Sequence, residues 1–372
     1  MTDNRGYLKK YHFDERQFEE LKNNFISGKF SEKDNVIAGR VETPADNYFC
    51  NTETLGNELQ KKYRETGGRA IRQGGLGVVI VNGGMATRFG GIVKGAVEVF
   101  DGKTFLQLKI EQVKAVNKRY SVNIPVYIMN SFSTEQATVE LFKKNNFFGM
   151  SENNIHFFNQ YIFKRLNPDG SEFMTGSFSG NMQDQFSAPG HGDFIFAFKG
   201  EGFPDRFIGA GGKYIWYSNV DNLGATIDEV ILGYHIESGA EMLAEVARKE
   251  PGDKGGAPAM VNGKLQIVEG FMFPPEFDQD NINVFNTATC IFSAEALLKN
   301  VILPWYAVKK DVGGKKIIQF ERLTGDLSKF LNTKFIVVDR GKRFIPIKTP
   351  HDLEQQRDSL RKKFSGTPLT SF

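Results

Sequence analysis

Short apolar runs recur through the middle of the chain, and stretches of helical length with one apolar face separate them. The runs that we expect to form strands cover 77–81, 126–130, 155–158 and 214–218. The stretches that we expect to form helices cover 104–118, a segment after the capping residues 131–134 that ends at 144, and 227–236. Because strand and helix alternate at this spacing, the pattern predicts a doubly wound, mostly parallel, Rossmann-like α/β sheet.

The two ends of the chain have a different pattern. Phe18, Leu21 and Phe25 fall on one face of a predicted helix over 14–27, and the polar stretch that follows contains a further charged segment. We therefore predict a helical amino-terminal region that packs against the main domain, and a charged helix in the tail. The predicted boundaries are 1–74 for the amino-terminal region, 75–350 for the main domain and 351–372 for the helical tail.

The second half of the main domain is less regular. The dipeptide Asn262-Gly263 predicts a hairpin over 260–270, and the segment 241–247 fits a strand or a helix equally well. A polar and aromatic stretch over 165–189 has no period and is expected to form a loop over the sheet. Further strands are expected at 289–292, 317–320, 335–339 and 344–347.

The run that ends at Val81 opens into a glycine-rich loop, which is the most informative stretch of the sequence. Its glycines lie at 83, 84, 90 and 91. Open α/β sheets bind ligands at the carboxyl ends of their strands, and glycines let the main chain approach phosphate oxygens closely. The spacing matches neither a P-loop nor GxGxxG, so a plain glycine-rich turn is the alternative. The polar residues Thr87, Arg88 and Lys94 on the same loop favour phosphate binding.

Composition narrows the class of protein. A chain of 372 residues suits one large α/β domain with additions, or two domains. The net charge of +3 is too small to indicate nucleic acid or a membrane surface as a partner. Two cysteines, Cys50 and Cys290, make no disulfide framework, and neither a secretory signal nor a membrane-spanning run is present. We therefore expect a cytoplasmic protein.

Ten short motifs follow one another from residue 81 to residue 353. They are VNGG (81–84), VEV (97–99), DGKTFL (101–106), MNSFST (129–134), FNQ (158–160), PGHGD (189–193), SNVDNLGATID (218–228), KGGAP (254–258), VFNT (284–287) and FIPIKTPHDL (344–353). In this order they resemble the eukaryotic-type UTP–glucose-1-phosphate uridylyltransferases, also called UDP-glucose pyrophosphorylases. The most specific part of the resemblance is PGHGD followed by SNVDNLGAT.

The chain departs from the pattern of that family in two places. Ala86 stands where the family has glycine, and Ile92-Val93-Lys94 stands where it has Gly-Pro-Lys after one residue fewer. Arg88 is instead what the wider sugar nucleotidyltransferase group, including UDP-N-acetylglucosamine pyrophosphorylases, places after its threonine. Family members also carry a carboxyl-terminal β-helix that serves oligomerisation. Only about two dozen residues follow Lys348 here, so we expect a monomer, or a dimer formed by another surface.

The resemblance implies that UTP and glucose 1-phosphate react to give UDP-glucose and pyrophosphate, with Mg²⁺ as the cofactor. It assigns catalytic roles to Lys94 and Lys348, with Arg88 as a further candidate, and metal binding to Asp221. The implied nucleotide-binding residues are Val81, Asn82, Gly83, Gly84, Gln160 and Gly190. The implied residues for the sugar phosphate are His191, Asn219, Gly256 and Asn286.

The residue types agree with such a transfer, because the sequence has no Ser/His/Asp or Cys/His arrangement that would indicate a covalent step. Two alternatives stay open at this point. Arg88 is compatible with a pyrophosphorylase for UDP-N-acetylglucosamine or for several UDP-sugars. The altered loop is also compatible with a nucleotide-sugar-binding protein without turnover, although Lys94, Asp221 and Lys348 are all retained.

Overall fold

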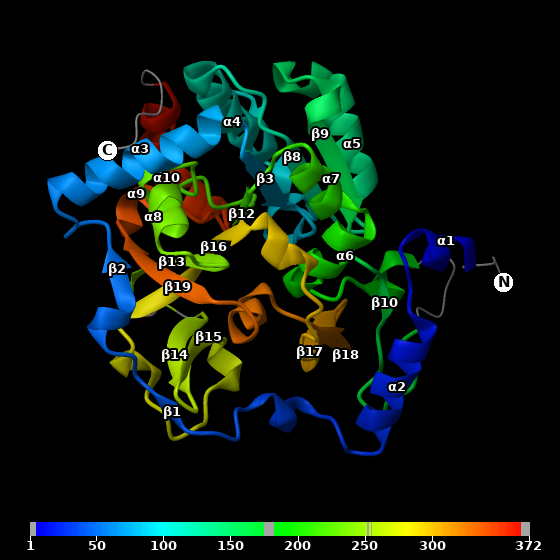
Figure 1. Ribbon diagram of the computed structural model, residues 1–372. Helices are drawn as coiled ribbons and strands as arrows, with labels where there is room; N and C mark the ends of the chain where they lie inside the picture. Colours follow the sequence, from blue (N-terminus) through cyan, green and yellow to red (C-terminus); the bar gives the residue numbers. More distant parts are fainter. Residues whose placement is uncertain (1–4, 175–181, 251–252, 254, 366–372) are drawn as a thin grey trace.

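The computed structural model describes residues 5–174, 182–250, 253 and 255–365 (Figure 1). Its central sheet has eight strands in the order β2-β19-β13-β16-β12-β3-β8-β9. Their bounds are β2 Phe49–Asn51, β19 Thr333–Val338, β13 Met242–Arg248, β16 Val284–Ser293, β12 Tyr214–Asn219, β3 Leu76–Val81, β8 Val126–Asn130 and β9 Ile155–Asn159. All neighbours in this sheet are parallel except β16, which runs antiparallel to both β13 and β12.

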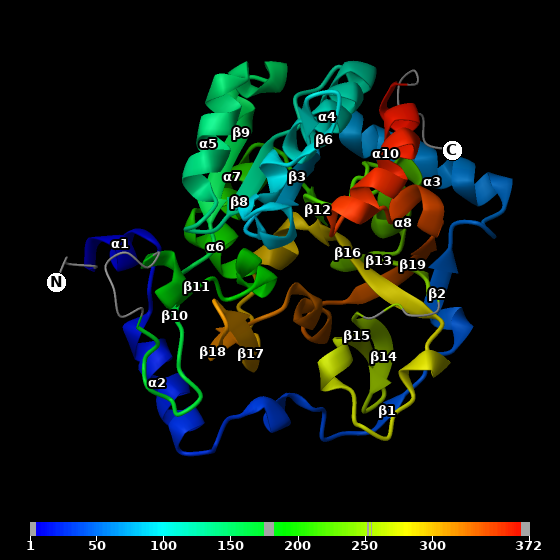
Figure 2. The same cartoon turned by 180° about the vertical axis from the view of Figure 1, so that it is seen from behind.

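Helices cover both faces of this sheet, as the apolar strands require. On one face, Ile80 and Trp216 pack with residues of helices α3 (Asn57–Arg72), α4 (Phe105–Tyr120), α5 (Glu135–Lys144), α8 (Glu229–Glu237) and α10 (Pro350–Ser365). On the other face, Val79 and Tyr217 pack with residues of α6 (Phe194–Gly200) and α7 (Phe203–Gly209). Figure 2 shows the same layers from behind. The predicted doubly wound α/β sheet is therefore confirmed.

Smaller elements complete the structure. Helices α1 (Arg5–Lys10) and α2 (Glu15–Ile26) lie at one end of the molecule, and residues of α2 pack with residues of β10 (Phe163–Lys164), β17 (Tyr306–Val312) and β18 (Lys315–Glu321). β10 pairs with β11 (Phe186–Ser187), and β17 pairs with β18. Two short hairpins follow β3, made of β4 (Met85–Ala86) with β5 (Ile92–Val93) and of β6 (Glu98–Phe100) with β7 (Lys103–Thr104).

Most predicted elements of the first half are present with nearly the predicted bounds. The strand at 126–130 matches β8 at both ends, and the predicted helix over 14–27 corresponds to α2, which Asp14 caps by accepting a hydrogen bond from the Gln17 amide. The predicted hairpin is formed by β14 (Ala257–Val261) and β15 (Lys264–Val268). Its turn residues Asn262 and Gly263 have φ values of 50° and 81°, as a type I′ turn requires.

The structure decides one segment that the sequence left open and corrects another. The segment 241–247 is a strand, β13, because it is buried on both faces between β16 and β19. The expected strand at 344–347 is wrong: helix α9 (Arg340–Arg343) precedes it, and Pro346 forms only an isolated bridge with Asn222. Pro346 lacks an amide N–H, so it cannot donate to a neighbouring strand.

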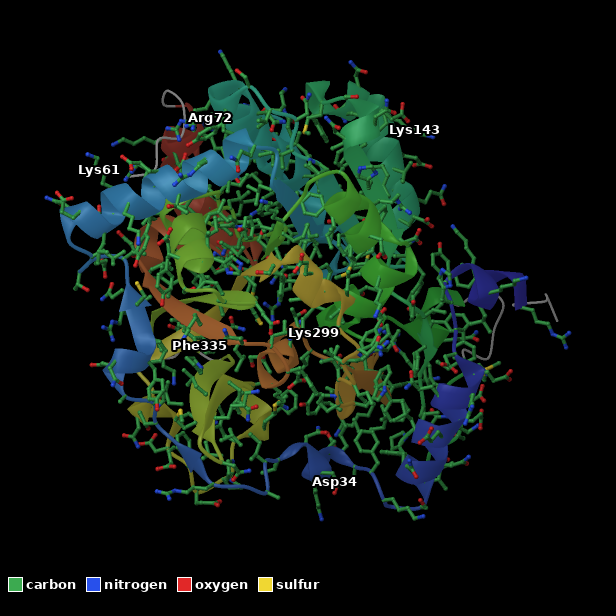
Figure 3. The ribbon with its side chains drawn as sticks, in the orientation of Figure 1. Asp34, Lys61, Arg72, Lys143, Lys299 and Phe335 are labelled. Atoms are coloured by element: carbon green, nitrogen blue, oxygen red, sulfur yellow. The ribbon has the colours of Figure 1, made fainter. Side chains whose placement is uncertain are left out.

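The amino-terminal region holds strands that its polar sequence did not predict. β1 (Val41–Glu42) pairs with β14, and β2 forms the edge of the central sheet beside β19. The division at residues 74 and 350 therefore stays a prediction. Phe335, labelled in Figure 3, belongs to β19 and is fully buried in the core. Residues 175–181 of the predicted loop, Lys254, and residues 366–372 of the predicted tail lie outside the described residues.

Candidate active site

The carboxyl ends of β3 and β12 form the point where the connections of the sheet diverge. From β3 the chain continues to β8 and β9 on one side, whereas β12 leads to β16 and β13 on the other. Val81 and Asn219, the last residues of β3 and β12, are direct partners in the sheet, and the Val220 amide donates to the Val81 carbonyl at 3.0 Å. A crevice at such a switch point is the usual ligand site of an open α/β sheet.

Lys94 and Asp221 meet at this point as an ion pair, although 127 residues separate them in the sequence. Both side chains are mostly shielded, with 23% of Lys94 and 13% of Asp221 exposed. Asp221 lies in the turn after β12, and Lys94 follows the β4–β5 hairpin, where its amide donates to the Gly84 carbonyl at 3.3 Å. Among the described residues, the second carboxylate oxygen of Asp221, Oδ1, has no hydrogen-bond partner.

The side chain of Asn82 connects the end of the glycine loop to the interior of the protein. Its Oδ1 accepts from the Gly95 amide at 3.1 Å, and its Nδ2 donates to Asn130 Oδ1 at 3.0 Å and to Thr138 Oγ1 at 2.8 Å. The side chain is therefore engaged inside the protein, so only the backbone of Asn82 is left to face a ligand. Arg88 lies exposed in the connection between β4 and β5.

The backbone just before Lys348 is hydrogen-bonded to the turn that carries Asp221. The Ile347 amide donates to the Asp221 carbonyl at 3.3 Å, and the Ile345 amide donates to Asn222 Oδ1 at 3.0 Å. Asp352, in the first turn of α10, accepts from the amides of Lys348 at 2.9 Å and Thr349 at 2.8 Å, which fixes this turn of backbone. The Lys348 side chain is exposed.

Two buried polar side chains of α4, which the sequence analysis did not single out, support the turn from Ser218 to Thr226. From α4, Lys109 Nζ donates to Ser218 Oγ at 3.2 Å and to the Ala225 carbonyl at 3.1 Å, and Gln112 donates to the Leu223 carbonyl at 3.0 Å. Burial lowers the pKa of Lys109 to about 7, against the attraction of the Asp221 carboxylate. The sequence feature that could have revealed these two residues is the presence of a lysine and a glutamine on the apolar side of a predicted amphipathic helix.

A buried ion pair holds the other end of this turn. Arg343 Nη2 and Nε donate to the Glu245 carboxylate at 2.6 and 2.9 Å, and Arg343 Nη1 donates to the Thr226 carbonyl at 2.9 Å. Both side chains are at least nine-tenths buried. Since Arg343 directly precedes the segment that carries Lys348, this pair connects the two stretches of chain that provide Asp221 and Lys348.

Gly83, Gln160 and Gly190 form a second group beside β8 and β9. Gln160 Nε2 donates to the Gly190 carbonyl at 3.2 Å, and the Gln160 amide group lies against the Cα of Gly83. The Ser131 hydroxyl donates to the Gly83 carbonyl at 2.8 Å. Three of the predicted nucleotide-binding residues are thus in contact with one another.

His191 is held in one tautomer by Thr324. The Thr324 amide donates to His191 Nδ1 at 3.0 Å, and the Thr324 hydroxyl donates to the His191 carbonyl at 2.7 Å. Burial lowers the pKa of His191, with a partial opposing effect of Glu321. The imidazole is therefore neutral at pH 7 and carries its proton on Nε2, where it can donate to an anionic group.

Gly256 and Asn286 lie together, and Glu269 lies against them. The Asn286 amide donates to the Gly256 carbonyl at 2.8 Å, and a Cβ on Gly256 would stand 2.8 Å from the carboxylate carbon of Glu269. Burial raises the pKa of Glu269 to about 7, and the charge of Asp326 raises it further, whereas the Gly256 amide lowers it. Sequence reasoning missed Glu269, although a carboxylate directly after an apolar strand is the signal that pointed to Asp221.

The described residues contain no group of three or more His, Cys, Asp or Glu side chains that could enclose a metal ion. In the same part of the chain, no helix is long and apolar enough to cross a membrane. The predicted site residues and Glu269 instead provide two carboxylates, two lysines, a neutral imidazole donor and exposed loop backbone. Such a set of groups can bind and orient phosphorylated reactants, and it offers no activated nucleophile.

Comparison with known structures gives the fold. A mutant of UDP-glucose pyrophosphorylase from Leishmania major, solved in complex with UDP-glucose, is 25% identical with a TM-score of 0.71, covering 91% of this chain and 74% of that one. A UDP-N-acetylglucosamine pyrophosphorylase from Entamoeba histolytica has a TM-score of 0.74 at 20% identity, covering 84% of each chain. The second likeness shows the shared fold alone.

Sequence comparison is more specific. UTP–glucose-1-phosphate uridylyltransferase 2 from Dictyostelium discoideum is 33% identical over 291 residues, which make up 75% of this chain and 57% of that protein. The chain thus spans less than three-fifths of the length of this relative. The family model for UTP–glucose-1-phosphate uridylyltransferase matches residues 15–363. Because this match includes the whole central sheet and every predicted site residue, the chain belongs to the UTP–glucose-1-phosphate uridylyltransferase family.

Proposed function

We propose that this chain transfers a uridylyl group from UTP to glucose 1-phosphate, giving UDP-glucose and pyrophosphate. The observation that carries the proposal is the Lys94–Asp221 pair at the switch point of the sheet. A lysine and a carboxylate are poised there beside glycine-rich backbone, where an anionic nucleotide would lie. The bound UDP-glucose in the Leishmania major relative supports the choice of ligand.

In the proposed reaction an oxygen of the sugar phosphate attacks the α-phosphorus of UTP in line, and pyrophosphate leaves with the bonding electron pair. The sugar phosphate is already ionised at neutral pH, so no protein base is needed. The protein has to orient two anions and offset their repulsion, which is electrostatic work. Lys94 would contact the triphosphate, and Lys348 would turn its exposed ammonium group to the reacting phosphates.

Asp221 fits a Mg²⁺ ion, because Mg²⁺ takes few protein ligands and prefers carboxylate and phosphate oxygens. Its Oδ1 lacks a partner among the described residues and is available for such a bond. When bound, the ion would supply positive charge to the phosphate oxygens. Lys94 contacts the other oxygen, Oδ2, so it keeps the carboxylate oriented toward the crevice.

The remaining contacts suggest where each part of the reactants would lie. Gln160 offers a donor and an acceptor to the edge of uracil, with Gly83 and Gly190 beside it. His191 would donate from Nε2 to a phosphate, and Asn219 would contact the sugar or its phosphate. We assign Gly256, Asn286 and Glu269 to the hydroxyl groups of the sugar, because Glu269 adds an acceptor directly beside Gly256.

The direct test is to incubate the protein with UTP, Mg²⁺ and glucose 1-phosphate and to measure UDP-glucose and pyrophosphate. We expect both products in equal amounts, and a clear preference for glucose 1-phosphate over N-acetylglucosamine 1-phosphate in a parallel reaction. A reversed preference would support the sugar alternative suggested by Arg88. UTP binding without any product would instead support a binding protein without turnover.

Lys348→Ala is expected to lower kcat by at least about two orders of magnitude, the size of losing one transition-state contact. The exposed side chain forms no hydrogen bond or ion pair with a described residue, and it acts on Asp253 only through its charge, so UTP affinity and the melting temperature should stay close to those of the wild type. Steady-state kinetics and UTP titration would measure the two effects separately. Wild-type turnover in this variant would remove Lys348 from the mechanism.

A further inference from the structure

A cavity lies at the opposite end of the strands that form the candidate active site. Its volume is about 580 Å³, and it is lined by Thr66, Arg69, Ala70, Gln73, Gly75, Gly211, Lys213, Tyr214 and Ile236. Gly75 directly precedes β3, and Lys213 directly precedes β12. The cavity thus opens at the amino ends of the two strands whose carboxyl ends hold Val81 and Asn219, and a molecule bound in it cannot touch the reactants.

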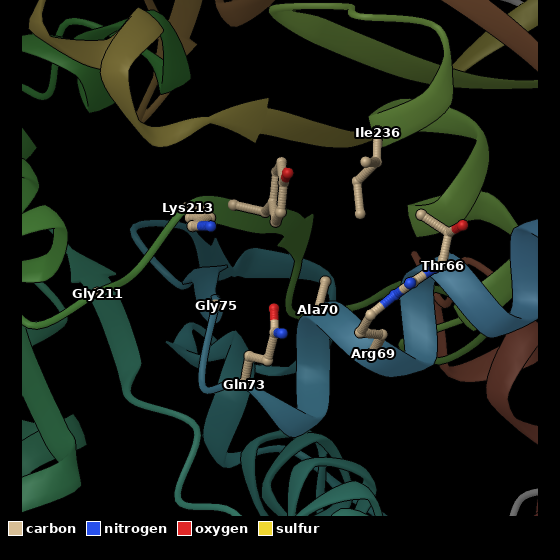
Figure 4. Close-up of a pocket in the computed structure, with 9 residues that line it drawn as sticks. Thr66, Arg69, Ala70, Gln73, Gly75, Gly211, Lys213 and Ile236 are labelled. Atoms are coloured by element: carbon tan, nitrogen blue, oxygen red, sulfur yellow. The ribbon is translucent and has the colours of Figure 1, made fainter.

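The lining combines two cations with an apolar base. Thr66, Arg69, Ala70 and Gln73 lie on one face of α3 at helical spacing, and Lys213 and Ile236 face them from other elements (Figure 4). The side chains of Arg69 and Lys213 form no hydrogen bond or ion pair with any residue that the structure describes. The apolar part consists of Ala70, Ile236 and the half-buried Tyr214, which packs edge-on against His235.

The acidic group beside the cavity is already engaged. Glu237 accepts from Thr66 Oγ1 at 3.1 Å and pairs with Lys62 at 2.5 Å. Lys62, its ion-pair partner, lowers the pKa of Glu237 most, and the charge of Arg69 lowers it further. Neither Arg69 nor Lys213 forms an ion pair with a carboxylate that the structure describes. His235 does not add a positive charge, because burial lowers its pKa to about 3.

We propose that this cavity binds a small organic phosphate whose phosphate group lies between Arg69 and Lys213 and whose apolar part covers Tyr214 and Ile236. A guanidinium group offers paired donors to phosphate oxygens, and an ammonium group adds a point charge. Gln73 supplies a further donor, and the apolar base accommodates a ring that a bare inorganic ion lacks. The proposal does not depend on catalysis at the other end of the sheet.

The test follows the rate at which an amine-reactive reagent labels individual lysines, read by peptide mass spectrometry. Phenyl phosphate is the probe, with inorganic phosphate and phenol as matched halves of it, at constant ionic strength and with UDP-glucose present in saturating amount. We expect phenyl phosphate to slow labelling of Lys213 at least about fivefold, and to act at lower concentration than inorganic phosphate. Labelling of Lys61, exposed on α3 and marked in Figure 3, should not change.

Arg69→Ala should weaken the protection by at least about tenfold, because it removes a charged contact to the phosphate. Arg72→Ala is the matched control: it removes the same charge from the same helix, but Arg72 packs over Tyr120 and does not line the cavity (Figure 3). Gln73→Glu changes an exposed residue at the end of α3, so the helix should be kept. It should abolish binding because it places a carboxylate beside the phosphate. The proposal fails if Lys213 is not protected, if Lys61 is protected equally, or if Arg69→Ala and Arg72→Ala have the same effect.

Discussion

Replacing Lys94 with alanine is expected to lower kcat by about three orders of magnitude. Charge-neutralising side chains at transferring phosphoryl groups have effects of this size, because no other group can move into their place. In this chain the substitution removes two roles, since Lys94 would neutralise the triphosphate and also orients the Asp221 carboxylate. Steady-state rates of UDP-glucose formation would measure the effect, with circular dichroism as the check that the fold is kept.

Lys103→Ala is the control for this prediction. Lys103 is near Lys94 in sequence, but it pairs with Glu111 of α4 instead of facing the crevice. Its removal should change kcat by less than about twofold, as expected for a partly exposed ion pair. If the two variants had similar rates, the crevice at β3 and β12 would not be the place where charge is neutralised.

Replacing Lys109 with methionine is expected to make the protein more stable at pH 7. A fall of its pKa from 10.5 to about 7 corresponds to a cost of about 5 kcal/mol for the charged form in the folded state. Methionine removes that cost and also the two hydrogen bonds to Ser218 and Ala225, worth about 1 kcal/mol each. The net gain in the free energy of unfolding should be about 2 to 3 kcal/mol.

The sign of the pH dependence distinguishes this cause from a simple packing effect. Between pH 7 and 10.5 the unfolded chain keeps a proton on Lys109 that the folded chain has lost, so wild-type stability rises with pH over this window. The advantage of Lys109→Met should therefore shrink by about 2 kcal/mol from pH 7 to pH 9, measured by urea unfolding. Lys118→Met, at an exposed position on the same helix, should show a constant difference from the wild type. A pH-independent advantage for Lys109→Met would contradict the assignment.

The central strands could be predicted because burial on both faces leaves a direct mark on the sequence. β3, β8 and β12 are apolar except for the polar residues that end β8 and β12, and each was expected within about one residue of its observed bounds. β1 and β2 carry no such mark, since their residues are only half-buried and their pairing depends on partners far away in the chain. The segment 344–347 carries the mark of a strand, but its alternating isoleucines pack beneath the turn after β12 instead of beside a strand.

The site was predictable at the level of motifs and less so at the level of single side chains. The glycine loop, the strand-end aspartate and the IPIKT segment meet in the structure through the Lys94–Asp221 ion pair and the hydrogen bond from the Ile347 amide to the Asp221 carbonyl, whereas the roles of Lys94, Asp221 and Lys348 stay predictions. That Lys94 and Asp221 form an ion pair follows only from the three-dimensional arrangement, as does the inward use of the Asn82 amide group. Lys109 and Glu269 were missed because one polar residue on an apolar face has no distinctive spacing.

The pairing of β2 with β19 has a consequence for how the chain is made. Cys50 lies beside Ile336, and Thr52 Oγ1 donates to a carbonyl 285 positions further along. During synthesis Thr52 leaves the ribosome 285 residues before Val337, its hydrogen-bond partner in the neighbouring strand. The edge strand β2 therefore stays unpaired while those residues are synthesised, which makes it a segment on which a nascent-chain chaperone could act.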